Sequence, residues 1–259
     1  MIVLKTQSEI EIMAKGGKIL GEILEKVVEK VKPGISTLDL NQYADLLINN
    51  YQGLASFKTV KNYHWATCIC INDVVVHGIP KNEEKIKDGD IVGIDIGLLY
   101  KGFHTDMSTS LIAGYSTDKK RKRFLETGKN TLDKAIEAIH QDGFIGDISK
   151  IIQTMIEEEG YNIVKELVGH GVGKNLHEDP QIPGWLPKTK KPEETGKLRV
   201  GMVLAIEIIY VLGKADIIYG NDGWTIKTLD GSPAGLFEKT VAVTKTGPKV
   251  LTPFKDKVL

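Results

Sequence analysis

The stretch IVGIDIG at residues 91–97 places a carboxylate, Asp95, in a run that is otherwise apolar and rich in β-branched residues. The stretch MVLAIEIIY at residues 202–210 does the same with Glu207. Short apolar runs with β-branched residues predict buried strands. An ionised carboxylate in a buried strand is strongly unfavourable unless a positive charge neutralises it. Both strands therefore predict a positive charge close to their acids.

The two stretches belong to a longer internal similarity. Residues 86–96 align without gaps over residues 198–208, matching a basic residue, a glycine, an apolar run and the acid. This match predicts two related halves, each of which points one carboxylate into a shared cavity. A chance match is the alternative.

Composition is that of an ordinary folded chain of enzyme size. The 259 residues include 34 Lys and Arg against 34 Asp and Glu, so no net field favours nucleic acid or an anionic membrane. The basic run at residues 119–123 favours a solvated helix face, with a transient ribosome contact as the alternative. Apolar runs are too short to cross a bilayer, and the N-terminus lacks the apolar core of a signal peptide.

Cysteine usage points to a reducing compartment. Cys68 and Cys70 stand two positions apart in one predicted strand, where a relaxed disulfide cannot form. A Cys-x-Cys metal pair is the alternative. We expect a cytoplasmic protein with no membrane partner and no specific nucleic-acid partner.

Helical and strand patterns alternate along the chain, which predicts an α+β fold. The capping box at Thr6 to Glu9 begins a helix that ends before Pro33. Further helices are expected from Ser36 or Thr37 to about Gly53, and over 117–140 and 147–159. Strands are expected over 67–77, 91–98, 105–113, 163–170, 202–211 and 236–244, and residues 180–197 read as a surface loop.

Four acids and one imidazole form the candidate chemistry: Asp95, Asp106, His170, Glu207 and Glu238. A hairpin turn at residues 101–102 would bring Asp95 and Asp106 onto neighbouring strands. Such an oxygen-rich set suits Mn, Fe, Co or Zn, and four carboxylates are more than one zinc ion usually takes. The set predicts a two-metal hydrolytic site.

Three histidines stand in glycine- or proline-flanked segments, as residues of site loops often do. His170 lies in GHGVG (169–173), His77 in VHGIP (76–80) and His177 in LHEDP (176–180). For each histidine taken alone, a structural role is the alternative.

In order and spacing, these phrases resemble those of methionine aminopeptidase. The phrases that carry the resemblance are HGIP (77–80), DIG (95–97) with Asp106, GHGVG (169–173), HEDP (177–180), IE (206–207) and FE (237–238). The resemblance covers nearly the whole chain. It implies the pita-bread (creatinase/aminopeptidase-like) fold, a pseudo-two-fold antiparallel sheet covered by helices, in one catalytic domain over 1–259. The interval from His170 to Glu207 is too short for the type 2 insertion, so type 1 fits best.

The resemblance also implies roles for individual residues. The metal ligands would be Asp95, Asp106, His170, Glu207 and Glu238, with Asp106 and Glu238 bridging two divalent ions (Co, Mn, Fe, Zn or Ni). A metal-bridging hydroxide would attack the first peptide carbonyl. His77 and His177 would contact the substrate, and Glu207 would also move a proton. Tyr63, Cys68 and Trp224 would line the pocket for methionine.

Two positions depart from the family pattern. Leu176 and Val60 stand where relatives commonly carry aromatic residues, which alters the expected pocket shape. The expected activity is removal of the initiator methionine from nascent proteins whose second residue is small, by a monomer. The alternatives are a prolidase or Xaa-Pro aminopeptidase, a metal-free binding module of the same fold, and a domain whose acids are merely solvated or salt-bridged.

Overall fold

Helices and antiparallel strands alternate along the chain, which a computed structural model describes over residues 1–256. The helices are α1 (Gln7–Val28), α2 (Thr37–Asn50), α3 (Lys119–Glu137) and α4 (Ile145–Glu158), with 3-10 turns η1 (Ser56–Thr59) and η2 (Pro192–Glu194). The strands are β1 (Leu54–Ala55), β2 (Thr67–Ile71), β3 (Val74–Val76), β4 (Ile91–Tyr100), β5 (Phe103–Ile112), β6 (Asn162–Ile163), β7 (Val168–Gly171), β8 (Glu178–Pro183), β9 (Val203–Val211), β10 (Ile217–Tyr219), β11 (Ile226–Thr228), β12 (Ala234–Thr244) and β13 (Gly247–Val250). The α+β prediction is confirmed.

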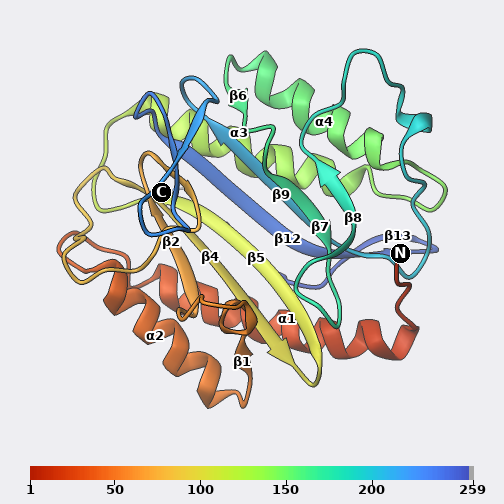
Figure 1. The fold of residues 1–259 in the computed structure, drawn as a ribbon, viewed down its shortest axis with the longest axis horizontal. Coiled ribbons are helices and arrows are strands. Elements are labelled where there is room, and N and C mark those ends of the chain that lie inside the picture. The colour runs from red at the N-terminus through yellow and green to blue at the C-terminus, as the bar shows by residue number, and fades with distance from the viewer. Residues whose placement is uncertain (257–259) are drawn as a thin grey trace.

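The larger sheet runs in the order β1-β4-β5-β12-β9-β7-β8, and its neighbouring strands are antiparallel. Strands β4 and β5 come from the first half of the chain and β12 and β9 from the second. Helix α1 contacts β4 and β5, whereas α3 contacts β12 and β9 (Figure 1). The two strands that carry the sequence repeat, β4 and β9, thus take matching outer places around a central β5-β12 pair.

Side-chain alternation gives each central strand a helix-facing and a cavity-facing set. In the first half, Ile94 and Ile96 pack in one apolar cluster with Leu20 and Leu24 of α1. In the second half, residues of β9 and β12 pack against α3 and α4 in another cluster, which includes Leu204, Ile206, Phe124, Ile148 and Phe237. The intervening residues, Asp95 and Glu207 among them, are left for the opposite face.

The first helix begins as its sequence predicts. Thr6 is the N-cap, and its Oγ1 accepts a hydrogen bond from the Glu9 N–H while Glu9 Oε2 accepts one from the Thr6 N–H. This reciprocal pair satisfies donors that the first turn leaves free. The same motif begins α2 at Ser36 with Asp39.

Three predicted segments differ from the structure. The strand expected over 67–77 is broken into β2 and β3, because Asn72 takes a left-handed φ of 50° and reverses the chain. The strand expected over 163–170 is two short strands, β6 and β7. The expected loop at 180–197 was wrong at its start, since β8 there pairs with β7.

Two further observations concern the environment of the chain. No helix within residues 1–256 is both long enough and apolar enough to cross a membrane. Cys68 and Cys70 are free thiols, as their spacing predicted.

Candidate active site

The five candidate metal ligands lie on five consecutive strands of the larger sheet. From β4 to β7 these are Asp95 on β4, Asp106 on β5, Glu238 on β12, Glu207 on β9 and His170 on β7, and we call them the polar cluster. Register brings Asp95, Glu238 and Glu207 level, because Glu238 is paired with Glu207 on one side and with Ser108 on the other, and Ser108 is paired with Asp95. Asp106 and His170 lie two positions away along their strands, since Asp106 is paired with Gly97 and His170 with Ala205. Residues distant in sequence thus meet at the centre of the sheet.

His170 is held in one orientation. Its Nδ1 lies 2.8 Å from the carbonyl oxygen of Gly171, and its Nε2 lies 3.3 Å from Glu207 Oε1. In the neutral ring, Nδ1–H donates to the carbonyl and Nε2 has its lone pair for a ligand on the cluster side, whereas in the protonated ring Nε2–H donates to Glu207. Burial lowers the pKa of His170, but the hydrogen bond and charge of Glu207 outweigh it and raise that pKa overall.

The acids of the cluster are closely spaced and largely shielded from water. Asp106 and Glu238 are only 4% and 2% exposed. One carboxylate oxygen of Asp106, one of Glu238 and one ring nitrogen of His170 all lie within 4.8 Å of one another. Desolvation, and then the neighbouring carboxylates, raise the pKa of Asp95, Asp106 and Glu238 well above the usual range. Without a bound cation, the ionised forms of these three carboxyl groups are therefore disfavoured.

Two atoms of the cluster also lack partners. Among the described residues, none donates a hydrogen bond to Asp95 Oδ1 or Glu238 Oε1, although both atoms are buried. Buried carboxylate oxygens that remain unpaired are costly unless they coordinate a cation. The donor set of carboxylates with one imidazole therefore fits divalent metal ions.

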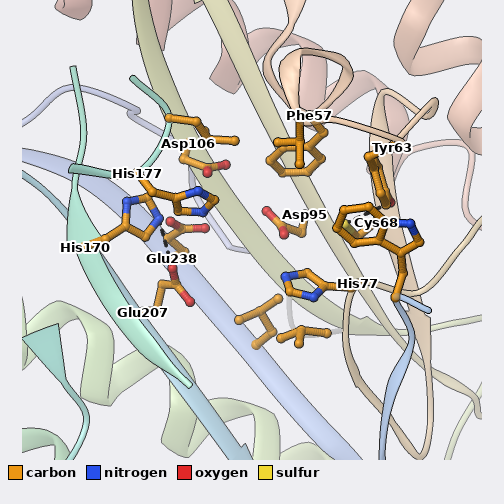
Figure 2. Close-up of a pocket in the computed structure, with 15 residues that line it drawn as sticks. Phe57, Tyr63, Cys68, His77, Asp95, Asp106, His170, His177, Glu207 and Glu238 are labelled. Carbon is orange, nitrogen blue, oxygen red and sulfur yellow. Dashed lines mark hydrogen bonds and ion pairs between the residues drawn. The ribbon is translucent and has the colours of Figure 1, made fainter. Parts of the chain in front are cut away.

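A cavity of about 140 Å³ lies directly against the cluster. Figure 2 shows Asp106, Glu207, Glu238 and His170 gathered on one side, Phe57, Tyr63 and Cys68 on the other, and Asp95 between the two groups. Its apolar side, which we call the apolar wall, consists of Phe57, Val60, Tyr63, Cys68, Leu176 and Trp224. A wider groove of about 610 Å³ shares His77, His170 and His177 with this cavity.

Aromatic rings give the apolar wall its shape. Tyr63 packs edge to face against Phe57 and Trp224, with ring centroids 6.2 Å and 5.1 Å apart. The Tyr63 hydroxyl donates to the carbonyl oxygen of Thr67 at 2.9 Å and lies 3.1 Å from Cys68 Sγ. Burial raises the pKa of the Cys68 thiol well above its usual value, so Cys68 is a neutral wall residue and a poor nucleophile.

The two remaining histidines stand where the cavity opens into the groove. His77 follows β3 with a left-handed φ of 56°, a strained conformation that in a non-glycine residue often marks a functional site. Burial lowers the pKa of His77, and burial together with nearby imidazoles lowers that of His177 to about 4. Both rings are therefore neutral near pH 7 in the metal-free protein and can exchange hydrogen bonds with a peptide.

The structure brings every site residue named from the sequence to this one cavity. It also adds Phe57, Val76 and Leu236. Strand alternation could have found Leu236, two positions before Glu238, and Val76 adjoins His77. Phe57 lies in the 3-10 turn η1, where no periodic pattern marks it.

Comparison with known proteins decides the family. Residues 11–245 match metallopeptidase family M24. The chain belongs to this family. It is 39% identical over 255 residues to methionine aminopeptidase of Clostridium perfringens, covering 98% of this chain and 100% of the relative. It is 41% identical over 257 residues to that of Aquifex aeolicus, covering 97% and 98%.

Solved structures support the same placement. The methionine aminopeptidase of Thermotoga maritima superposes with a TM-score of 0.93 at 38% identity, covering 97% of this chain and 99% of the other. A prolidase of Pyrococcus horikoshii, at 22% identity, has a TM-score of 0.77 over 100% of this chain but only 66% of its own. The M24 chain therefore has the pita-bread fold and resembles methionine aminopeptidases along its full length.

Proposed function

We propose that this M24 peptidase removes the N-terminal methionine from proteins whose second residue is small. The observation that carries the proposal is that the polar cluster and the apolar wall line the same small pocket of about 140 Å³. A hydrolytic centre beside a small pocket suits an exopeptidase, since the pocket has room for one terminal side chain. Family membership and full-length similarity to methionine aminopeptidases support the same activity.

Asp95, Asp106, His170, Glu207 and Glu238 would hold two divalent ions drawn from Mn, Fe, Co, Zn or Ni. When bound, such ions polarise a carbonyl and lower the pKa of water, which supplies a nucleophile at neutral pH. The protein's part is to keep five donors close together on five adjacent strands and to surround them with packed side chains. Unpaired oxygens on Asp95 and Glu238 are what support their assignment as ligands.

The apolar wall would bind the methionine side chain. An unbranched thioether adapts to an irregular pocket and gains favourable contacts with aromatic rings. Phe57, Tyr63 and Trp224 provide such rings, and Cys68 completes the wall as a neutral thiol. Val60 and Leu176 make part of the lining aliphatic, so the pocket combines aromatic and aliphatic surfaces.

The histidines and Glu207 would orient the peptide and move protons. His77 and His177 stand at the boundary of cavity and groove, beside the place where a scissile bond would lie. His77 would hold the substrate near that bond, and His177 would donate to the oxygen that becomes negative. A Glu207 carboxylate oxygen would take a proton from the attacking water and deliver it to the leaving amine.

Selection for a small second residue follows from the packed side chains at the boundary between the cavity and the groove. A peptide leaving the cavity for the groove must pass Val76, His77, His170, His177 and Glu207, which line both spaces. A bulky second side chain would contact these packed groups, whereas glycine or alanine would pass. The remaining chain would continue into the wider groove.

Wider aspects of the function are also proposals. Nascent polypeptides are the natural substrates of such a site, and we place the protein in the cytoplasm, where free thiols such as Cys68 and Cys70 persist. We further propose that residues 1–259 act as one catalytic domain in a monomer, with the basic run at 119–123 as the place to test for a transient ribosome contact.

The deciding experiment uses metal-stripped enzyme titrated with Mn or Co, and the peptides Met-Gly, Met-Leu, Ala-Pro and acetyl-Met-Gly. We expect metal-dependent release of methionine from Met-Gly alone, because the pocket needs methionine, the boundary needs a small second residue, and the site needs a free amine. Cleavage of Ala-Pro would move the chain to the prolidase branch of the family. Absence of turnover with either metal would contradict the proposed activity.

A further inference from the structure

The two halves of the sheet meet at a short seam, the contact between β5 and β12. Main-chain pairing across this seam is limited to Glu238 with Ser108 and Lys239 with Met107. By contrast, β4 pairs with β5 from Ile91 to Tyr100, and β9 pairs with β12 over nine positions. The seam matters because Asp106 lies on one of its strands and Glu238 on the other, so their separation depends on how it is held.

Next to the last main-chain pair of the seam, a side-chain hydroxyl forms the hydrogen bonds between the two strands. Thr240 Oγ1 accepts a hydrogen bond from the Asp106 N–H at 2.9 Å and donates one to the Asp106 carbonyl oxygen at 2.7 Å. Thr240 is fully buried and Asp106 is 4% exposed. We call this pair of bonds the Thr240 bridge. It satisfies both main-chain groups of Asp106 without direct pairing of the strands.

The main chain of Thr240 is occupied elsewhere. Its N–H donates to Thr252 Oγ1 at 2.9 Å, and its carbonyl oxygen accepts from the Leu251 N–H at 2.8 Å. The segment that follows β13 therefore occupies the edge of β12 at the point where β5 would otherwise pair. The Thr240 hydroxyl links β12 to the main chain of Asp106 across this gap.

A second hydroxyl bridge lies on the other side of the seam in a reciprocal position. Ser110 Oγ of β5 donates to the Leu236 carbonyl oxygen at 2.9 Å and accepts from the Leu236 N–H at 3.0 Å. Both bridges lie two residues from the central Glu238–Ser108 pair, and each uses a hydroxyl of one half on the main chain of the other. We call this the Ser110 bridge. The Ser110 bridge binds the main chain of Leu236, an apolar residue, whereas the Thr240 bridge binds the main chain of Asp106, a proposed metal ligand.

The carboxylate of Asp106 depends on the main chain that carries it. Asp106 Oδ1 accepts a hydrogen bond from the Met107 N–H at 3.1 Å, so side chain and local backbone move together. Glu238 is held from the other side by the main-chain pairing of β12 with β9, in which it lies opposite Glu207. A shift of β5 at Asp106 would therefore change its distance to Glu238 while leaving Glu238 in place.

We propose that Thr240 is a positioning residue of the metal centre: its hydroxyl fixes the main chain of Asp106 against β12, so that carboxylates from the two halves converge on the same ions. The proposal rests on the proposed function, since it assumes that Asp106 and Glu238 are ligands. Partners that orient metal ligands commonly contribute about 10- to 100-fold in metal affinity.

The test measures metal affinity, apart from activity. Titration of the metal-free protein with Co²⁺, followed by calorimetry and by the visible absorption of the bound ion, gives the affinity and the ligand geometry. Thr240→Val removes the hydroxyl at nearly constant shape, and we expect affinity to fall by about 10- to 100-fold with a changed Co²⁺ spectrum. Thr240→Ser keeps the hydroxyl and is expected to restore both. Ser110→Ala removes the reciprocal bridge, and it is expected to lower the unfolding temperature while leaving Co²⁺ affinity unchanged.

The outcomes separate the positioning role from the metal site itself. Wild-type affinity and spectrum in Thr240→Val, or an equal loss of affinity in Ser110→Ala, would overturn the role assigned to Thr240. Failure of the wild-type protein to bind any divalent ion would overturn the proposed metal site and this proposal with it. If Thr240→Val does not fold, Thr240→Ala removes the same hydroxyl without a methyl group facing β5 and is judged by the same criteria.

Discussion

The polar cluster and the apolar wall face each other across one small cavity, yet they are built in different ways. The cluster residues come from five adjacent strands, so each carboxylate inherits its position from sheet register. Most of the apolar wall comes from segments outside the larger sheet, including η1, the stretch before β2 and the loop that carries Trp224. The difference suggests that strands hold the reactive groups at fixed spacing, while loops form a pocket whose shape can vary without disturbing them.

Loss of one carboxylate from the cluster should have the largest effect. Asp106→Asn keeps the shape of the side chain but removes the charge, so we expect turnover of Met-Gly to fall by more than about 100-fold, the upper effect typical of groups that only orient a ligand. Metal analysis of the purified variant should also show fewer bound ions. The surface ion pair of Asp45 with Lys58 provides the control, since Asp45→Asn should change neither the turnover of Met-Gly nor the number of bound metal ions. Unchanged turnover in Asp106→Asn would refute a two-metal site.

Removing the metal should make stability depend on pH. Burial and mutual repulsion raise the folded-state pKa of Asp95, Asp106 and Glu238, so the folded protein binds more protons than the unfolded chain above pH 4.5, the higher of their ordinary values. The free energy of unfolding must then fall as pH rises.

We therefore expect the metal-free protein to melt at a lower temperature at pH 8.5 than at pH 6.5. The difference should exceed about 2–4 °C, the change that 1 kcal/mol produces in a chain of this size. Calorimetry with and without Mn checks this, because bound metal should flatten the profile. Asp106→Asn should also flatten it, and a metal-free profile that rises with pH would contradict the account.

Opening the apolar wall should weaken substrate binding without affecting the metal. Trp224→Ala removes a ring that contacts both Tyr63 and His77, so we expect KM for Met-Gly to rise by about 10-fold while kcat changes little. Co²⁺ affinity should match that of the wild type. Loss of metal affinity in this variant would show that the apolar wall and the polar cluster are coupled and would contradict their independence.

The smallest effect is expected in the loop that carries Trp224. Partial burial raises the pKa of Asp222, but hydrogen bonds from Thr225 and Trp224 outweigh it and bring the pKa to about 2. A folded pKa below the ordinary 3.8 contributes stability that is present above pH 3.8 and is lost as pH falls through about 2. Asp222→Asn should therefore destabilise the protein slightly at pH 7 and much less at pH 2.5.

Urea unfolding of Asp222→Asn and wild type at the two pH values measures this difference. The exposed Asp118→Asn change provides a comparison, because it removes a carboxylate charge at the N-cap of α3, where an amide oxygen can still accept the capping hydrogen bonds, and touches no contact of this loop. If the free energies of unfolding of Asp222→Asn and wild type differ more at pH 2.5 than at pH 7, the lowered pKa of Asp222 is not the cause of the destabilisation.

Much of the fold was predictable because its signals are local. Capping residues at Thr6 and Ser36 and apolar periodicity placed the helices, and the turn at residues 101–102 placed the β4-β5 hairpin. Predictions failed where tertiary contacts decide the backbone. A left-handed Asn72 divides one predicted strand, and pairing with β7 makes Glu178–Pro183 a strand despite its two prolines.

The sequence by itself determined which residues could form the site. An acid in a buried strand carries an energetic cost wherever that strand lies, so Asp95 and Glu207 stood out before any contact was known. The ordered motifs from His77 to Glu238 likewise identified the family pattern. The hairpin turn at residues 101–102 and the internal repeat predicted that Asp95, Asp106 and Glu207 would face one cavity.

Only the tertiary structure decided how the residues meet. The seam joins segments more than a hundred positions apart, and the hydrogen bonds of Thr240 to Asp106 depend on where the chain after β13 leaves the edge of β12. Phe57 became part of the apolar wall through the packing of an irregular segment. Such contacts have no periodic signature, because the distance between two side chains depends on the packing of every element between them.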